Sequence, residues 1–239
     1  MKHLYVVPLA VLAFGVSSCG FLTGASSYST GEEVDYATAK TRYEEINRKK
    51  SAIVPEKITI TGIDDGKPFE VRYDSISEFC YAKGVDLDGK VSEAWIYSLE
   101  DKYYDVEKKE GDADYTVTML TAENFSTSFS LSALAPYVYL AIPYATMDNV
   151  FSGESAPSST DEYNLAASYR SSKPGTLGLY LNKKPSSKAA SMKEEENVVA
   201  EFIDYLPSHY EGLADTELKK EKVKMDFSYT VKANYPKLK

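Results

Sequence analysis

Ser208 and His209 stand side by side, a pair that could form part of a hydrolase site. In that chemistry the imidazole accepts the proton of the serine hydroxyl, and an acidic residue orients the imidazole. The sequence has only 2 histidines and no Gly-x-Ser-x-Gly turn, and no acidic residue is marked by its spacing as a third member. We therefore expect no catalysis at this pair.

Asp86, Asp88 and Gly89 follow the start of a calcium-binding loop, and Glu93 lies a little further on. An EF-hand loop needs a third oxygen ligand early in the loop and a glutamate at its last position, and neither fits this spacing. Asp-Gly between two strand patterns is more typical of a hairpin turn. The sequence therefore predicts no metal site and no other cofactor.

Cys80 is the third residue type that could react, and it lies between Phe79 and Tyr81 on a predicted strand. A cysteine in such a place is commonly buried and inert. A reactive thiolate needs a neighbouring histidine or a helix N-terminus, and the sequence shows neither. We expect that the protein is not an enzyme.

Composition excludes other classes of protein. The chain of 239 residues has 27 Lys and Arg against 36 Asp and Glu, a formal charge of -9, which argues against a nucleic-acid partner. A hydrophobic content of 43% is sufficient for a folded core. Tyrosine is abundant, with 20 residues against 9 phenylalanines and 1 tryptophan. Tyrosine is therefore the one compositional indication of function.

The N-terminus has the features of a segment that is removed from the mature protein. Lys2 supplies a positive charge, and the uncharged stretch from Leu4 to Val16 has the length of a signal-peptide core. One aliphatic residue, two small residues and a cysteine follow, as Val16-Ser17-Ser18-Cys19. An ordinary secretory signal with an incidental cysteine is the alternative interpretation.

These four residues resemble the lipobox of bacterial lipoproteins. The resemblance implies that the Cys19 sulfur carries a diacylglycerol and that acyl chains such as palmitate anchor the protein. Residues 1–18 are then the lipoprotein signal peptide and residues 19–30 a flexible tether. Two acyl chains hold a protein stably on a membrane, so we expect a lipid-anchored protein on the extracytoplasmic face of the cell membrane.

The mature chain begins with a predicted helix and continues with strands. Thr30 and Glu33 have capping-box spacing, which predicts a helix over 31–52, ended by Pro55. From residue 58 to residue 120 the apolar residues alternate, and turn signals such as Asp65-Gly66 separate up to six strands of an antiparallel meander. The helix places its apolar residues on one face: Tyr36, Ala39, Tyr43 and Ile46.

Residues 124–147 contain no charged side chain. A transmembrane helix is one interpretation, but Pro136, Pro143 and many hydroxyl groups make a poor membrane span. Buried helical segments that break at the two prolines fit better.

The C-terminal half returns to strand patterns at 163–169, 177–181 and 223–231, whereas 194–206 fits either a helix or a strand. The economical interpretation is a single α+β domain over 31–239, with a curved, half-barrel-like antiparallel sheet packed over a few helices.

The tyrosines and the uncharged stretch together indicate a lining for an apolar ligand, although most tyrosines are equally explained as core and sheet surface. The residues that we expect to contact such a ligand are Trp95, Tyr97, Leu134, Tyr137, Tyr139, Leu140 and Tyr144.

The order of elements resembles the half-barrel lipoprotein carriers of the LolA and LppX/LprG type, over about residues 31–236. The resemblance implies a curved sheet that wraps helices and shelters acyl chains, without catalytic residues. We expect a monomeric lipoprotein that binds or carries a lipid or other hydrophobic ligand. The alternative is an adhesion or envelope-assembly module that binds a protein or a glycan through its Tyr-rich sheet.

Overall fold

A computed structural model describes residues 32–50, 52–85, 89–152, 169–171, 175–181, 198–216 and 219–238. These residues form three helices and twelve strands, and every strand pair whose register is described is antiparallel. They divide into two compact units, one built from 55–139 and 227–238 and the other from 32–54 and 140–226. The prediction of an α+β protein with an antiparallel sheet and few helices is confirmed.

The first unit contains the predicted meander of six strands, each paired with the next. Two of its turns need left-handed backbone: Asp65 and Gly66 have φ of 46° and 77°, and Glu100 and Asp101 have 52° and 59°. Such paired positive φ angles make the tight turns that suit twisted strands. The strands are β2 (Lys57–Asp64), β3 (Lys67–Asp74), β4 (Phe79–Val85), β5 (Val91–Leu99), β6 (Lys102–Lys109) and β7 (Thr116–Leu120).

Alternation along these strands gives the sheet of the first unit two different faces. One face packs against α2 (Ala122–Ser132), through contacts of Cys80 and Ile96 with Phe125. We call it the helix face. Thr121 caps α2, because its hydroxyl accepts a hydrogen bond from the Asn124 N–H at 3.3 Å.

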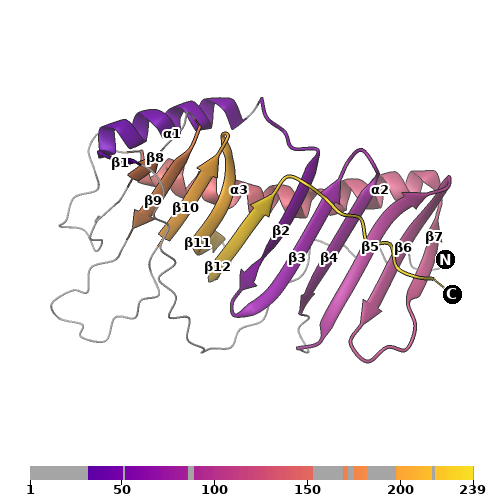
Figure 1. The fold of residues 1–239 in the computed structure, drawn as a ribbon. Helices are drawn as coiled ribbons and strands as arrows, with labels where there is room; N and C mark the ends of the chain where they lie inside the picture. Colours follow the sequence, from indigo (N-terminus) through magenta and orange to yellow (C-terminus); the bar gives the residue numbers. More distant parts are fainter. Residues whose placement is uncertain are drawn as a thin grey trace. The chain divides into compact units, whose positions relative to one another are not determined.

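The opposite face is crossed by the C-terminal segment of the chain. Residues 229–238, which we call the strap, are extended and pass across the strands, as the yellow trace in Figure 1 shows. The sequence pattern predicted a strand to residue 231, but β12 (Lys219–Ser228) ends at Ser228, so Tyr229 and Val231 belong to the strap.

The second unit contains α1 (Tyr36–Lys50), whose buried residues Ala39, Tyr43 and Ile46 confirm the predicted apolar face. The predicted start at residue 31 is wrong. Asp35 caps the helix, because its carboxylate accepts a hydrogen bond from the Thr38 N–H at 2.7 Å. Residues 32–34 instead form β1 (Glu32–Val34), which pairs with β8 (Tyr169–Ser171). Pairing with a strand distant in sequence overrode the local capping signal.

The remaining strands of the second unit are β9 (Leu177–Leu181), β10 (Val198–Ile203), β11 (Leu206–Thr216) and β12, paired in that order. The ambiguous segment 194–206 is therefore strand where it is described, with a turn at Asp204 and Tyr205. The sequence pattern did not indicate β11, which carries Pro207 and a register shift opposite Glu201 and Phe202.

The helical part of the uncharged stretch breaks at Ala133, between α2 and α3 (Leu134–Val150). The expectation of breaks at both prolines is wrong. Pro136 lies in the first turn of α3, where no backbone N–H is needed, and Pro143 lies inside α3 without ending it. Several expectations lie outside the described residues: the signal peptide, Cys19 and the tether, Asp86 and Asp88, the strand at 163–168, and the segment 182–193.

Candidate functional site

The helix face of the first unit is filled with aromatic rings. Phe125 of α2 stacks on Tyr103 with ring centroids 4.6 Å apart. Tyr139 stacks on Phe69 at 4.8 Å, and Tyr73 contacts the ring of Phe129 at 5.6 Å. Rings at these separations are in direct contact. The helices therefore pack onto the sheet without an intervening layer at these positions.

Tyrosine hydroxyls at the helices donate to backbone carbonyls. In the first unit the Tyr137 hydroxyl donates to the Pro55 carbonyl at 3.1 Å. In the second unit Tyr43 donates to the Tyr144 carbonyl at 2.8 Å, and Tyr144 donates to the Tyr205 carbonyl at 3.0 Å. Burial raises the pKa of Tyr144 to about 12, so its hydroxyl keeps the proton that it donates. The rings can then present carbon surface while their polar atoms are satisfied.

The outer side of the same helices is apolar and exposed. Leu134 and Val138 are 53% and 61% exposed, and Leu131 is also exposed. These three residues recur at steps of three and four, so they share one side of the helical segment. We call them the apolar helical face. Surface helices of soluble proteins normally carry charged or polar residues on such a side.

The seven residues predicted to contact a ligand do not come together. Tyr137 and Tyr139 point at the helix face of the first unit, and Leu140 and Tyr144 are buried in the second. Leu134 lies on the apolar helical face. Trp95 and Tyr97 lie on the opposite side of the first unit's sheet, because Ile96 between them is the residue that faces α2.

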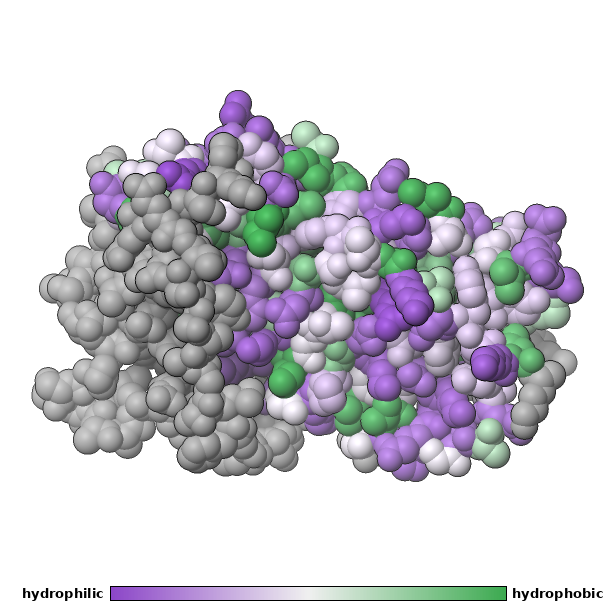
Figure 2. Space-filling model, viewed as in Figure 1, coloured by the Kyte–Doolittle hydropathy of each residue, from purple (hydrophilic) through white to green (hydrophobic). Residues whose placement is uncertain are grey.

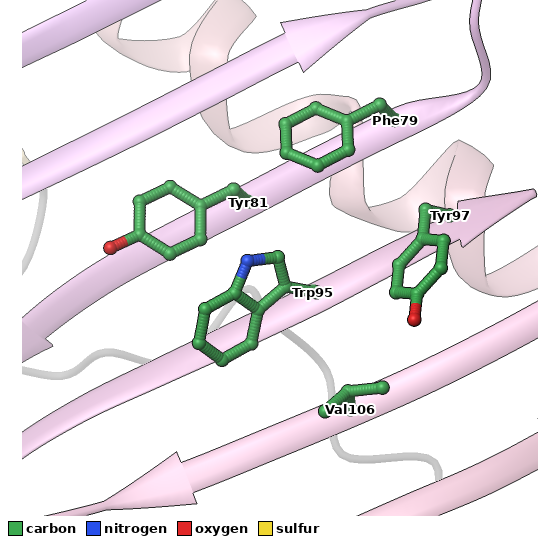
Figure 3. Close-up of a cluster of buried hydrophobic side chains, with 5 residues drawn as sticks. All are labelled: Phe79, Tyr81, Trp95, Tyr97 and Val106. Carbon is green, nitrogen blue, oxygen red and sulfur yellow. The ribbon is translucent and has the colours of Figure 1, made fainter. Parts of the chain in front are cut away.

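Trp95 and Tyr97 belong to an aromatic cluster under the strap. Phe79 and Tyr81, on β4, lie beside Trp95 and Tyr97, on β5, and Val106 of β6 completes the buried group (Figure 3). The strap contributes Val231 and Ala233, which pack against this cluster, and Tyr235, whose ring meets Tyr97 at 5.1 Å. The cluster is therefore a second buried core of the first unit.

Backbone carbonyls of the strap at every second residue accept hydrogen bonds from the sheet. Thr59 donates to the Thr230 carbonyl at 2.8 Å, Arg72 to the Lys232 carbonyl at 3.0 Å, and the Trp95 indole to the Asn234 carbonyl at 3.0 Å. Sequence reasoning missed these partners. The alternation of Val231, Ala233 and Tyr235 indicated an extended segment, but it did not indicate which residues the segment contacts.

Cys80 is buried on the helix face, as predicted. Its Sγ lies 3.8 Å from the Ser132 carbonyl, and burial raises the pKa of the thiol to about 12. A thiol with that pKa holds almost no thiolate at neutral pH, so it is a poor nucleophile.

His209 is buried between carboxylates on two strands. Its Nδ1 lies 2.6 Å from the Asp226 carboxylate and its Nε2 lies 3.1 Å from the Glu211 carboxylate. Lys224 donates to the same Glu211 oxygen at 2.6 Å. The hydrogen bond from His209 holds the pKa of Glu211 at about 2, against the opposing effect of burial.

This arrangement gives the Ser208–His209 pair no hydrolase geometry. Both imidazole nitrogens face carboxylates, and the Ser208 Oγ is buried without a hydrogen-bond partner in the described part of the chain. In a serine hydrolase one nitrogen must instead accept the serine proton. Among the described residues no group of His, Cys, Asp and Glu side chains is arranged to hold a metal ion.

No protein-family model matches this chain, and no curated protein matches it. By length and composition alone, the helical segment Ala122–Val150 could cross a membrane. This property does not identify a membrane span, because core helices of soluble proteins share it.

Proposed function

We propose that this protein is an extracytoplasmic bacterial lipoprotein, anchored through Cys19, that binds lipids or other hydrophobic ligands at the apolar helical face. The observation that carries the proposal is the exposure of Leu134 and Val138 within a stretch of 24 residues, 124–147, that has no charge. Contiguous exposed apolar surface is costly in water and marks contact sites.

The order of elements supports the same proposal. After the short strand β1, one helix, six strands, two helices and further strands follow each other along the chain, an order close to that of the half-barrel carriers that the sequence resembles. In this proposal the sheet is curved and the tyrosine rings with satisfied hydroxyls form its amphipathic side. The stacked rings of the helix face leave the outer side of α2 and α3 as the surface where a ligand binds.

The test replaces exposed residues of the apolar helical face and leaves the buried core unchanged. The domain 30–239 contains every described residue, and we expect it to float with phospholipid vesicles and to release lipid into organic solvent for mass spectrometry. Leu134→Gln with Val138→Gln should weaken vesicle binding by about tenfold or more, because each change removes exposed apolar contact area.

Ile76→Gln is the matched control, because Ile76 is 65% exposed and lies in the turn before β4. This control should bind vesicles like the parent domain. The proposal is wrong if the parent domain neither carries lipid nor binds vesicles, or if the control weakens binding as much as the double variant does.

A second candidate function is an adhesion or envelope-assembly module that binds a protein or glycan. The observation that favours it is the direct ring packing on the helix face, at 4.6 Å between Phe125 and Tyr103, because a filled interface leaves no room there for an acyl chain. A specific protein partner captured by crosslinking on whole cells, in the absence of bound lipid, would favour this function.

The anchor has its own test. Cys19→Ala removes the only sulfur that can take the diacylglycerol at this site, so we expect incorporation of labelled fatty acid to be lost and the precursor to remain uncleaved. Normal processing and labelling of this variant would show that the lipobox assignment is wrong.

A further inference from the structure

The strand β7 forms an edge of the sheet in the first unit. It pairs with β6 on one side, and no described residue pairs with its other side. The backbone N–H and C=O groups on the outer side of such a strand are a template for another strand. Proteins usually protect a sheet edge with charged residues, proline or a bulge.

The two terminal strands in the strand order differ in this protection. β1 (Glu32–Val34) carries two adjacent carboxylates, Glu32 and Glu33. β7 has the sequence Thr-Val-Thr-Met-Leu, without a charged residue or a proline. Its pairing with β6 runs over five consecutive residues without a register shift. Among the described residues, the edge of β7 is therefore open to pairing.

The side chains of β7 are also exposed. Val117 and Met119 are 43% and 65% exposed, and register places them beside Val106 and Tyr104, on the face that the strap crosses. Figure 2, viewed as in Figure 1, shows apolar residues among polar ones at this end of the face. Backbone groups and apolar side chains are thus available together on one strand.

We propose that two copies of this chain pair through β7, antiparallel and related by a two-fold axis at Thr118. In this register Thr118 lies opposite Thr118 of the other copy, Val117 lies opposite Met119, and Thr116 lies opposite Leu120. Apolar residues meet apolar residues on the strap side, and no charged side chain opposes another over the five residues.

The two-fold symmetry makes the register self-consistent. In an antiparallel pair, two residues directly opposite each other either both point their N–H and C=O groups at the partner strand or both point them away. Because residues 116, 118 and 120 alternate with 117 and 119, the proposed register always places residues of the same kind opposite each other. Such a contact is at the small end of protein interfaces, so we expect a weak dimer that covalent trapping can reveal. This proposal replaces the expectation of a monomer.

Thr118→Cys in the full chain tests the register, because the two copies of residue 118 face each other. Their Cα atoms would lie about 4.5–5.5 Å apart, within the range that a disulfide spans. Thr116→Cys is the matched control: it lies on the same strand and the same face, but its two copies would be about 13 Å apart along the strand direction.

We expect oxidation of the purified protein to give about tenfold more covalent dimer for Thr118→Cys than for Thr116→Cys. The parent chain measures the background of dimer that forms through its own cysteines. Adding Val117→Lys to Thr118→Cys should lower the yield about tenfold, because a lysine on the edge opposes pairing. Adding Ile76→Lys should leave the yield unchanged. Equal crosslinking at residues 116 and 118, a yield at the parent background, or crosslinking that persists with Val117→Lys would overturn the proposal.

Discussion

Trp95→Ala is expected to lower the free energy of unfolding by about 3–5 kcal/mol, the range typical of a large buried aromatic residue. Trp95 is 3% exposed, contacts the rings of Tyr81 and Tyr115, and donates its indole N–H to the Asn234 carbonyl at 3.0 Å. The substitution removes the centre of the aromatic cluster and the hydrogen bond that holds the strap at Asn234. Urea denaturation of the variant and the parent measures the loss.

The same variant should release the strap. The Lys232 carbonyl accepts a hydrogen bond from Arg72, so the bond after Lys232 is held against the sheet in the parent protein. We expect trypsin to cleave after Lys232 faster in Trp95→Ala, while cleavage after exposed Lys237 changes little. Lys237 therefore serves as an internal control within the same chain.

Trp95→Phe separates the ring from its hydrogen bond. Phenylalanine keeps aromatic contact but leaves the Asn234 carbonyl without its indole donor, so a loss of about 1–2 kcal/mol is expected. If Trp95→Ala lost less than Trp95→Phe, or left the Lys232 site protected, the strap would not depend on this cluster.

His209→Gln is expected to destabilise the protein by about 1–3 kcal/mol at pH 5.5, and by less at pH 9. Burial disfavours the charged imidazole, but hydrogen bonds to Glu211 and Asp226 outweigh burial and raise the pKa of His209 above its usual value. Glu201 lies opposite His209 on β10, and Lys224 is bonded to Glu211. A neutral imidazole has one N–H and can donate to only one of the two carboxylates.

The sign of the pH dependence follows from the raised pKa. The protonated imidazole contributes stability that is fully present below the unfolded value of about 6.5 and is lost as the pH rises through the folded pKa. The parent protein should therefore lose more stability than His209→Gln between pH 6 and pH 9. Denaturation midpoints across this range measure the difference, and parallel profiles would contradict the assignment.

Local sequence patterns predicted most of the secondary structure. Alternation and turn residues placed the six strands of the meander, because a twisted hairpin with Asp65-Gly66 needs residues that accept positive φ. Helical spacing placed Ala39, Tyr43 and Ile46 on one buried face. The absence of charge over 124–147 identified the helices that carry the apolar helical face.

The seven predicted ligand contacts lie in different places. Leu134 lies on the exposed apolar helical face, whereas Trp95 and Tyr97 belong to the cluster under the strap. The residue types of Trp95 and Tyr97 were consistent with either role, because aromatic residues are common both in buried cores and in ligand contacts. The side of the sheet on which each lies depends on register and on what covers that side.

By itself, the sequence determined the strand periodicity, the apolar side of α1 and the uncharged helical segment, because each depends on residues a few positions apart. Tertiary structure alone decided that β1 precedes α1, that His209 lies between two carboxylates, and that residues 229–238 cover an aromatic cluster. The Trp95–Asn234 hydrogen bond joins residues 139 positions apart. Local propensity carries no information about such pairs, because their energy appears only when distant segments meet.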